Sequence, residues 1–338
     1  MTSRLDRLYN RRIDNEIQNA TQLNEVYKRL TQSDSVKYVL GAMQPIDPAY
    51  TKATYAEGER VWNQLEKSLD QNCVLRYQGS VTNDTHIKAK SDIDLLTILT
   101  DFVSLELPQT PSDPYQGDPL QDLMNLRNDE IRILDSAFPE VSVDSSGGKS
   151  ICLEGGSLRR KIDVVPSNWY NTNLYAQHRE EVYRGVKILD AKNKTRIGNT
   201  PFLHNAYIDL KDDRVNGGIR KAARLMKSLA YDTEEIDLSS YDIVAIAYNM
   251  DDNLLNFRDE MELAILESCS QYCERLVWDE SLRANISVPD GHRTVFKDGH
   301  ATKAGLIALT QELNTLKNDV MTENARSFQK LADARVYY

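Results

Sequence analysis

The sequence predicts an α+β protein: a core with a mixed sheet, a long N-terminal helix before it and a helical bundle after it. Three observations support this. Residues 5–70 show helical spacing with few breakers, residues 73–166 contain short β-branched runs separated by turns, and helical periodicity returns after residue 200. The 338 residues suffice for two moderate domains. We expect them to be a core over 1–200 and a helical domain over 201–338.

The first long helix is predicted from the stretch "YAEGERVWNQLEKSL". Its apolar side chains recur at helical spacing, at Val61, Trp62, Leu65 and Leu69. Further along, residues 119–137 are typical of a second helix. The segment before it, "LELPQTPSDPYQGDP", carries four prolines and is interpreted as an exposed loop.

Strands are predicted from five short apolar runs. One hairpin is indicated within "LEGGSLRRKIDVV", where Gly155 and Gly156 supply the turn. The runs between residues 73 and 166 are "CVLRYQ", "DIDLLTIL", "VSVD", "SICLEG" and "RKIDVVP".

The helical half contains an amphipathic segment, "NGGIRKAARLMKSLAY". Its apolar stripe, which includes Ile219 and Met226, is expected to be buried. Arg220, Arg224 and Lys227 lie along one flank of the same helix. That flank either faces a cleft or forms a solvated basic edge.

Composition excludes several classes of protein. No apolar run approaches the roughly 18 residues that a membrane helix needs. The polar, charged N-terminal stretch lacks the apolar segment of a secretory signal, so we expect a cytoplasmic protein without membrane partners. A net charge of −10 argues against stable nucleic-acid binding, which depends on neutralising phosphates with Lys and Arg.

Two aspartates lie on one face of a predicted strand. Side chains alternate along a strand, so Asp92 and Asp94 point to one side while Ile93 and Leu95 point to the other. Carboxylates about 6 to 7 Å apart along a strand repel each other, and a divalent cation relieves that repulsion. The alternative is a solvated strand edge.

A third aspartate and a Gly-Ser pair extend this pattern. Asp163 in "RRKIDVVP" is flanked by apolar residues and is expected on the polar face of its strand. If the two strands are neighbours, three carboxylates converge and can hold two metal ions. Gly79 and Ser80 end an earlier strand, where exposed backbone N–H groups and a hydroxyl form a candidate phosphate cradle.

The combination of Gly79-Ser80, Asp92-Ile93-Asp94-Leu95 and a distant Asp163 resembles the nucleotidyltransferase superfamily of DNA polymerase β type. More narrowly, nearly the whole chain resembles the bacterial cGAS/DncV-like nucleotidyltransferases. These enzymes make cyclic di- or trinucleotide second messengers in anti-phage defence. The resemblance implies a polymerase β-like catalytic core whose cleft is closed by the helical domain. It further implies two Mg²⁺ ions, or Mn²⁺, on the three aspartates.

The resemblance also implies nucleotide contacts in the second half of the chain. Lys227 in "RLMKSL" is expected to bind the donor triphosphate, Ser240 in "LSSYD" a phosphate, and Tyr241 the base by stacking. Asn205, with His204 as its rival, is the candidate for reading the base. Packing of Tyr241 in the core and helix capping by Asn205 remain the alternatives.

The sequence is consistent with three functions. The first is a Mg²⁺-dependent synthase that joins NTPs into a cyclic product, releases pyrophosphate and signals to a downstream effector. The second transfers NMP to a protein or an RNA. The third is an inactive nucleotide-binding module. The sequence leaves open the bases, the linkage and the ring size.

Overall fold

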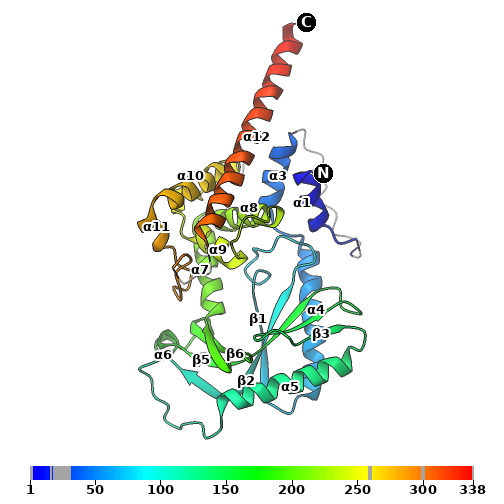
Figure 1. Cartoon of the computed structure of the whole chain (residues 1–338), viewed down its shortest axis with the longest axis vertical. Coiled ribbons are helices and arrows are strands. Elements are labelled where there is room, and N and C mark those ends of the chain that lie inside the picture. Colours follow the sequence, from blue (N-terminus) through cyan, green and yellow to red (C-terminus); the bar gives the residue numbers. More distant parts are fainter. Residues whose placement is uncertain (1–2, 16, 18–31, 258–260, 298–300, 337–338) are drawn as a thin grey trace. The chain divides into compact units, whose positions relative to one another are not determined.

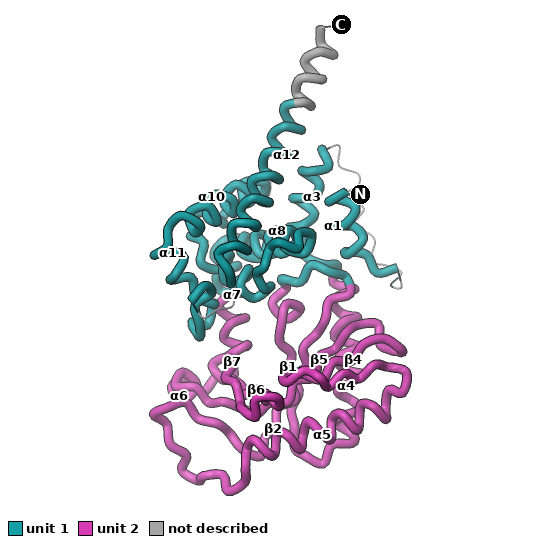
Figure 2. The backbone as a smooth tube through the Cα atoms, viewed as in Figure 1, with its two compact units in different colours: residues 1–47, 85–89, 208–338 teal, residues 48–84, 90–207 magenta. Residues whose placement is uncertain are grey.

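The computed structural model describes residues 3–15, 17, 32–257, 261–297 and 301–336 (Figure 1). Contacts between Cα atoms divide the chain into two units, coloured separately in Figure 2. Unit 1 contains residues 1–47, 85–89 and 208–338, and unit 2 contains residues 48–84 and 90–207. The predicted division into a core over 1–200 and a helical domain over 201–338 stays a prediction.

Unit 2 is built on a seven-stranded mixed sheet with the order β1-β2-β5-β4-β3, in which β6 joins β5 to β7. β5 pairs in parallel with β2, and in antiparallel fashion with β4 along its first half and with β6 along its second. The strands are β1 (Cys73–Gln78), β2 (Ile93–Leu105), β3 (Ser142–Asp144), β4 (Ile151–Glu154), β5 (Ile162–Asn171), β6 (Arg184–Asp190) and β7 (Thr195–Asn199).

Helices α4 (Pro48–Ser68) and α5 (Pro119–Ala137) cover one face of this sheet. Their side chains form one core with the apolar residues of β2, β4 and β5, among them Ile93 and Ile162. Alternation along each strand then turns the intervening side chains to the opposite face. The short helices of this unit are α6 (Asn173–His178) and the 3₁₀ turn η1 (Glu181–Tyr183).

Unit 1 is helical and is centred on α8 (Gly218–Asp232), which contacts α1, α3, α9, α10 and α12. Helix α7 (Pro201–Arg214) begins in unit 2 and ends in unit 1. The remaining elements are α1 (Arg4–Arg12), α3 (Asp34–Met43), α9 (Ser240–Tyr248), η2 (Asp252–Leu254), α10 (Ala264–Trp278), α11 (Glu280–Ala284) and α12 (Lys303–Val336).

The predicted fold class is confirmed. The predicted helix over 119–137 is α5, and the predicted hairpin is β4 and β5, with Gly155 and Gly156 at positive φ in its turn. Helical residues between 5 and 70 form α1, α3 and the 21-residue α4, while residues 16 and 18–31 lie outside the described residues.

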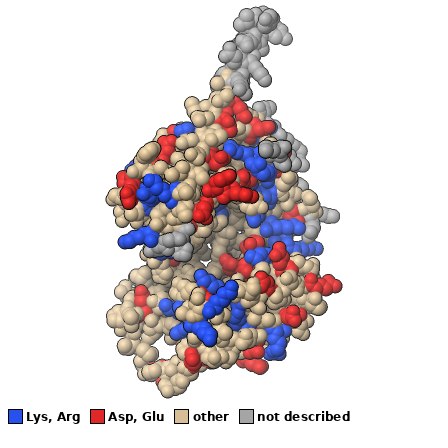
Figure 3. Space-filling model, in the orientation of Figure 1, with Lys and Arg blue, Asp and Glu red and all other residues tan. Residues whose placement is uncertain are grey.

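Among the helices that the structure describes, none combines the length and the apolar character that a membrane span requires. Acidic and basic side chains are mixed over the visible face of each unit (Figure 3).

Candidate active site

The parallel pairing of β2 and β5 brings two of the predicted aspartates together. Asp94 and Asp163 are Cα partners in its register. Neighbouring strands lie about 4.8 Å apart, and directly opposite residues share a face. Because Ile93 and Ile162 point to the core with α4 and α5, the two carboxylates point away from those helices.

Asp92 lies directly before β2 and is the most exposed of the three aspartates. Its side chain is 52% exposed, compared with 15% for Asp163. Burial raises the pKa of Asp94 to about 7, with further contributions from the charges of Asp163 and then Asp92; Lys161 opposes the shift. The three carboxylates are thus close enough to repel one another.

A lysine that the sequence analysis did not consider lies among these carboxylates. The Nζ atom of Lys161 is 3.1 Å from Oδ2 of Asp163 and 3.8 Å from Oδ2 of Asp92. The hydroxyl of Ser150, just before β4, donates to Oδ1 of Asp163 at 3.2 Å. Ser150 was missed because its contact depends on the pairing of β4 with β5, whereas the position of Lys161 two residues before Asp163 was a signal available in the sequence.

The carboxylates have the chemistry of a divalent-cation site. They provide hard oxygen donors, and the mutual repulsion within the cluster is relieved by a cation. With the side chains in their present positions, however, the described residues contain no group of three His, Cys, Asp or Glu arranged to hold a metal ion. The predicted sharing of two Mg²⁺ ions by Asp92, Asp94 and Asp163 therefore stays a prediction.

Gly79 is required by the close approach of β1 to Asp94. It has φ +91°, and a Cβ atom here would lie 2.5 Å from Oδ2 of Asp94. A side chain would therefore strain the backbone and displace the carboxylate. Ser80 begins a turn over residues 80–84. A hydrogen bond connects this turn to Gly79: Thr82 Oγ1 donates to the carbonyl of Gly79 at 2.7 Å.

Asn205, the candidate for reading the base, forms hydrogen bonds to two residues of this turn. Its Nδ2 donates to Oγ1 of Thr82 at 3.0 Å, and its Oδ1 accepts from Nδ2 of Asn83 at 3.3 Å. Both ends of the amide are thereby engaged within unit 2. The contact supports a role in fixing the candidate phosphate cradle, and base reading by Asn205 stays a prediction. His204 is buried, with 5% of its surface exposed.

Lys227 and Arg224 on α8 are buried in unit 1, so the solvated basic edge is a wrong description of this part of the helix. Lys227 Nζ donates to the carbonyl of Thr85 at 2.7 Å. Burial, with the nearby charges of Arg224 and Lys88, lowers the pKa of Lys227 to about 7. Arg220, further toward the start of the helix, forms ion pairs with carboxylates of α7.

Ser240 and Tyr241 begin α9 and are both exposed at the surface of unit 1. Tyr241 is therefore not a core residue, which leaves its ring accessible for the predicted stacking. Arg293 lies over that ring, with Cζ 5.1 Å from the centroid. The same guanidinium donates to Oδ1 of Asp242 at 2.7 Å. The predicted roles of Lys227, Ser240 and Tyr241 at a nucleotide are not tested by these contacts.

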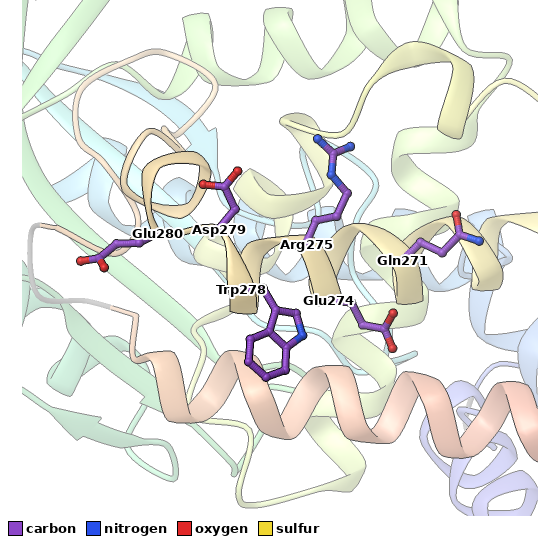
Figure 4. A pocket seen from close by; sticks show the side chains of 6 residues that line it. All are labelled: Gln271, Glu274, Arg275, Trp278, Asp279 and Glu280. Atoms are coloured by element: carbon purple, nitrogen blue, oxygen red, sulfur yellow. The ribbon is translucent and has the colours of Figure 1, made fainter.

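A separate open pocket runs along α10 and reaches the start of α11 (Figure 4). One of its lining residues, Trp278, is 86% exposed. None of the predicted site residues lies in it. The lining side chains are Gln271, Glu274, Arg275, Trp278, Asp279 and Glu280.

Known proteins resemble the chain over most of its length, although no family model matches it. The cyclic dinucleotide synthase CdnE of Yersinia aleksiciae is 37% identical over 313 residues, which cover 91% of this chain and 82% of that protein. A c-di-GMP synthase of Lachnospiraceae bacterium (strain RUG226) is 31% identical over 316 residues, covering 85% and 89% of the two chains.

The fold has a close structural counterpart. The solved structure of a STING-associated CdnE c-di-GMP synthase from Capnocytophaga granulosa superposes with a TM-score of 0.77. It is 27% identical, and the match covers 94% of this chain and 98% of that one. The similarity therefore extends through the sheet of unit 2 and the helices of unit 1.

Proposed function

Since the chain belongs to the bacterial cGAS/DncV-like nucleotidyltransferases, the family of cyclic oligonucleotide synthases, we propose that it joins two NTPs into a cyclic dinucleotide and releases pyrophosphate. The family and the enzyme class expected from the sequence are thereby confirmed. Two of the relatives described above are c-di-GMP synthases, which makes GTP the first substrate to test.

The observation that carries this proposal is the register of β2 and β5. It gathers Asp94 and Asp163 on one face of the sheet, beside a turn that follows Gly79, which has no side chain to displace Asp94. A protein that only binds nucleotides has no need of such a repulsive cluster, because it makes no charge that must be neutralised during a reaction.

The chain's own residues have distinct tasks in the reaction. Asp92, Asp94 and Asp163 would hold the divalent ions that the family uses, with Mg²⁺ as the proposed species. Such ions neutralise the triphosphate and make the attacking hydroxyl more acidic. The turn after Gly79 presents backbone N–H groups and the Ser80 hydroxyl to the donor phosphates.

The bond between the two nucleotides forms once the acceptor hydroxyl is positioned next to the donor α-phosphorus. The acceptor hydroxyl oxygen bonds to the donor α-phosphorus, the bond from that phosphorus to the pyrophosphate oxygen breaks, and the hydroxyl proton is released toward Asp163. Ser150 orients Asp163 by donating to Oδ1. A second transfer, after the linear intermediate has reoriented, closes the ring. Lys227, Ser240 and Tyr241 are proposed to bind the donor's phosphates and base.

A radiolabelled-NTP assay tests the proposal. Purified protein is incubated with each labelled NTP and Mg²⁺, singly and in pairs, and the mixture is then treated with phosphatase. We expect a small phosphatase-resistant product. Label on a macromolecule would instead indicate NMP transfer to a protein or an RNA. Unchanged NTP in every combination would contradict synthase activity.

A downstream partner follows from the same relatives. The superposed synthase is described as STING-associated. We propose that the product of this chain likewise binds a downstream receptor as a second messenger in anti-phage defence. Titrating the purified product into a STING-type receptor and measuring heat of binding tests that role, and an absence of binding would contradict it.

A further inference from the structure

The ion pairs of Lys161 lie where the proposed function needs a metal ion. We propose that Lys161 holds Asp92 and Asp163 together in the metal-free enzyme and competes with the divalent cation for them. This inference rests on the proposed function, because it assumes that these carboxylates bind the ion. Lys161 then acts as a positioning residue that sets the affinity of the site for metal.

The backbone fixes Lys161 in this place. It precedes β5 by one residue and Asp163 by two, so the alternation of the strand turns both side chains to the same face. Its carbonyl accepts from the N–H of Ile93, the first residue of β2, at 3.2 Å. The backbone of Lys161 is thereby fixed beside the strand that carries Asp94.

The charges explain why Lys161 occupies the cluster. An ammonium 3.1 Å from Asp163 and 3.8 Å from Asp92 offsets the repulsion between their carboxylates. It also lowers the pKa of Asp94 against the larger effects that raise it. A divalent ion bound to the same oxygens supplies twice the charge at shorter range. The two cations cannot share those positions, so metal binding requires the ammonium to move away.

An ordinary surface ion pair is the competing explanation. The Lys161 side chain is 34% exposed, and exposed ion pairs contribute little to stability. Such a pair would leave the metal affinity almost unchanged when broken. Competition instead predicts tighter metal binding when the ammonium is removed. Metal affinity, measured without substrate, therefore separates the two explanations.

The experiment measures Mn²⁺ binding to the purified full-length chain by electron paramagnetic resonance of the free ion. Binding that disappears in Asp94→Asn defines the site. We expect Lys161→Met to lower the dissociation constant of that site about tenfold, since a close competing charge is lost. Lys161→Arg keeps the charge and should remain near the wild type. If the Met variant does not fold, Lys161→Gln replaces it.

The matched control removes a lysine elsewhere in unit 2. Lys67→Met changes the net charge by the same amount at an exposed position in the last turn of α4. It lies just before the start of β1, which pairs with Leu99, whereas Asp94 pairs with the other end of β1. We expect at most about a twofold change, because distant charges are screened in water. A change as large as that of Lys161→Met would show a general charge effect and overturn the inference.

Thermal unfolding gives a second readout. In EDTA, Lys161→Met should lower the melting temperature, because the carboxylates lose a nearby positive charge. Added Mn²⁺ should raise the melting temperature of the variant more than that of the wild type. Wild-type binding that depends on Asp94, with no tighter binding in Lys161→Met, would contradict the inference alone. Absence of Asp94-dependent binding in both proteins would contradict the proposed metal site as well.

Discussion

Two carboxylates, one on β2 and one on α5, which packs against β2, have raised pKa values for different reasons. Asp94, at the start of the strand, has a pKa of about 7 because it is buried and because two other aspartates lie beside it. Glu130 on α5 is fully buried and has a pKa of about 8, mainly through burial, with Thr97 and Arg127 opposing the shift in part. A raised pKa is thus common to both regions, and only the first region gathers several like charges.

The difference identifies the functional region. Burial is the main cause of the raised pKa of Glu130 in the interface between α5 and the sheet, and no substrate is needed to explain it. The cluster at Asp94 is different, since repulsion among its members is relieved by a cation. We therefore expect substitutions at Asp94 to affect catalysis, and substitutions at Glu130 to affect stability.

The largest expected effect is on activity. Asp94→Asn should lower the rate of cyclic dinucleotide formation by about 10³-fold or more, since it removes a charge that the transition state requires. The same-strand control Asp101→Asn, at an exposed position of β2, should retain activity. Product formation from labelled NTPs measures both. Near-wild-type activity in Asp94→Asn would remove this carboxylate from the mechanism.

The next largest effect is on stability, at the ion pair between the buried Asp242 and Arg293. Asp242 is fully buried, accepts from Arg293 and forms a capping box with Ser239. Arg293→Ala should lower the free energy of unfolding by about 3 kcal/mol, because it leaves a buried charge without its counter-ion. Urea unfolding measures this change, and Arg293→Lys should restore part of the loss. A change below about 0.5 kcal/mol would indicate an unimportant ion pair.

Glu130 should make stability depend on pH. Its folded pKa of about 8 lies above the ordinary 4.5, so the folded protein holds a proton that the unfolded chain releases between these values. Stability from this group therefore falls as pH rises from 4.5 to 8, by at most about 1.4 kcal/mol per pH unit.

The variant Glu130→Gln should flatten this part of the stability curve while leaving NTP turnover unchanged. Urea unfolding at a series of pH values measures the slope. An equal slope in the variant and the wild type would assign the pH dependence to other groups. Loss of turnover without loss of stability would give Glu130 a part in catalysis and end the contrast with Asp94.

The smallest expected effect is at Asn205. Asn205→Ala removes two hydrogen bonds to the turn after Ser80 and should lower stability by about 1 kcal/mol. If the residue only fixes the turn, KM should rise for all accepted NTPs alike. A change confined to one base would support the base-reading prediction. Steady-state kinetics with each NTP separates these results.

Local patterns predicted much of the fold. The helix over 119–137 follows from apolar spacing, and the hairpin at Gly155 follows from its glycine pair. The shared face of Asp94 and Asp163 was also predictable, because each is flanked by core residues on its strand. Relatives then confirmed the family that these motifs resemble.

Contacts distant in sequence were not predictable. The approach of Lys161 to Asp92, the bond from Asn205 to the turn and the burial of Lys227 all depend on tertiary packing. A helical flank of basic residues has the same sequence pattern whether it is solvated or buried. The sequence therefore could not decide whether the basic residues of α8 face solvent or a cleft. Only the packing of its neighbours decides the outcome.

The central claim is that carboxylates of β2 and β5 bind the same metal ions at the donor triphosphate. A crystal structure with Mn²⁺ and a non-hydrolysable GTP analogue, with anomalous scattering collected at the manganese edge, tests it most directly. We predict an anomalous peak coordinated by carboxylate oxygens of both Asp94 and Asp163, with Lys161 moved away. A peak that contacts neither aspartate, or nucleotide bound elsewhere on the chain, would contradict the account.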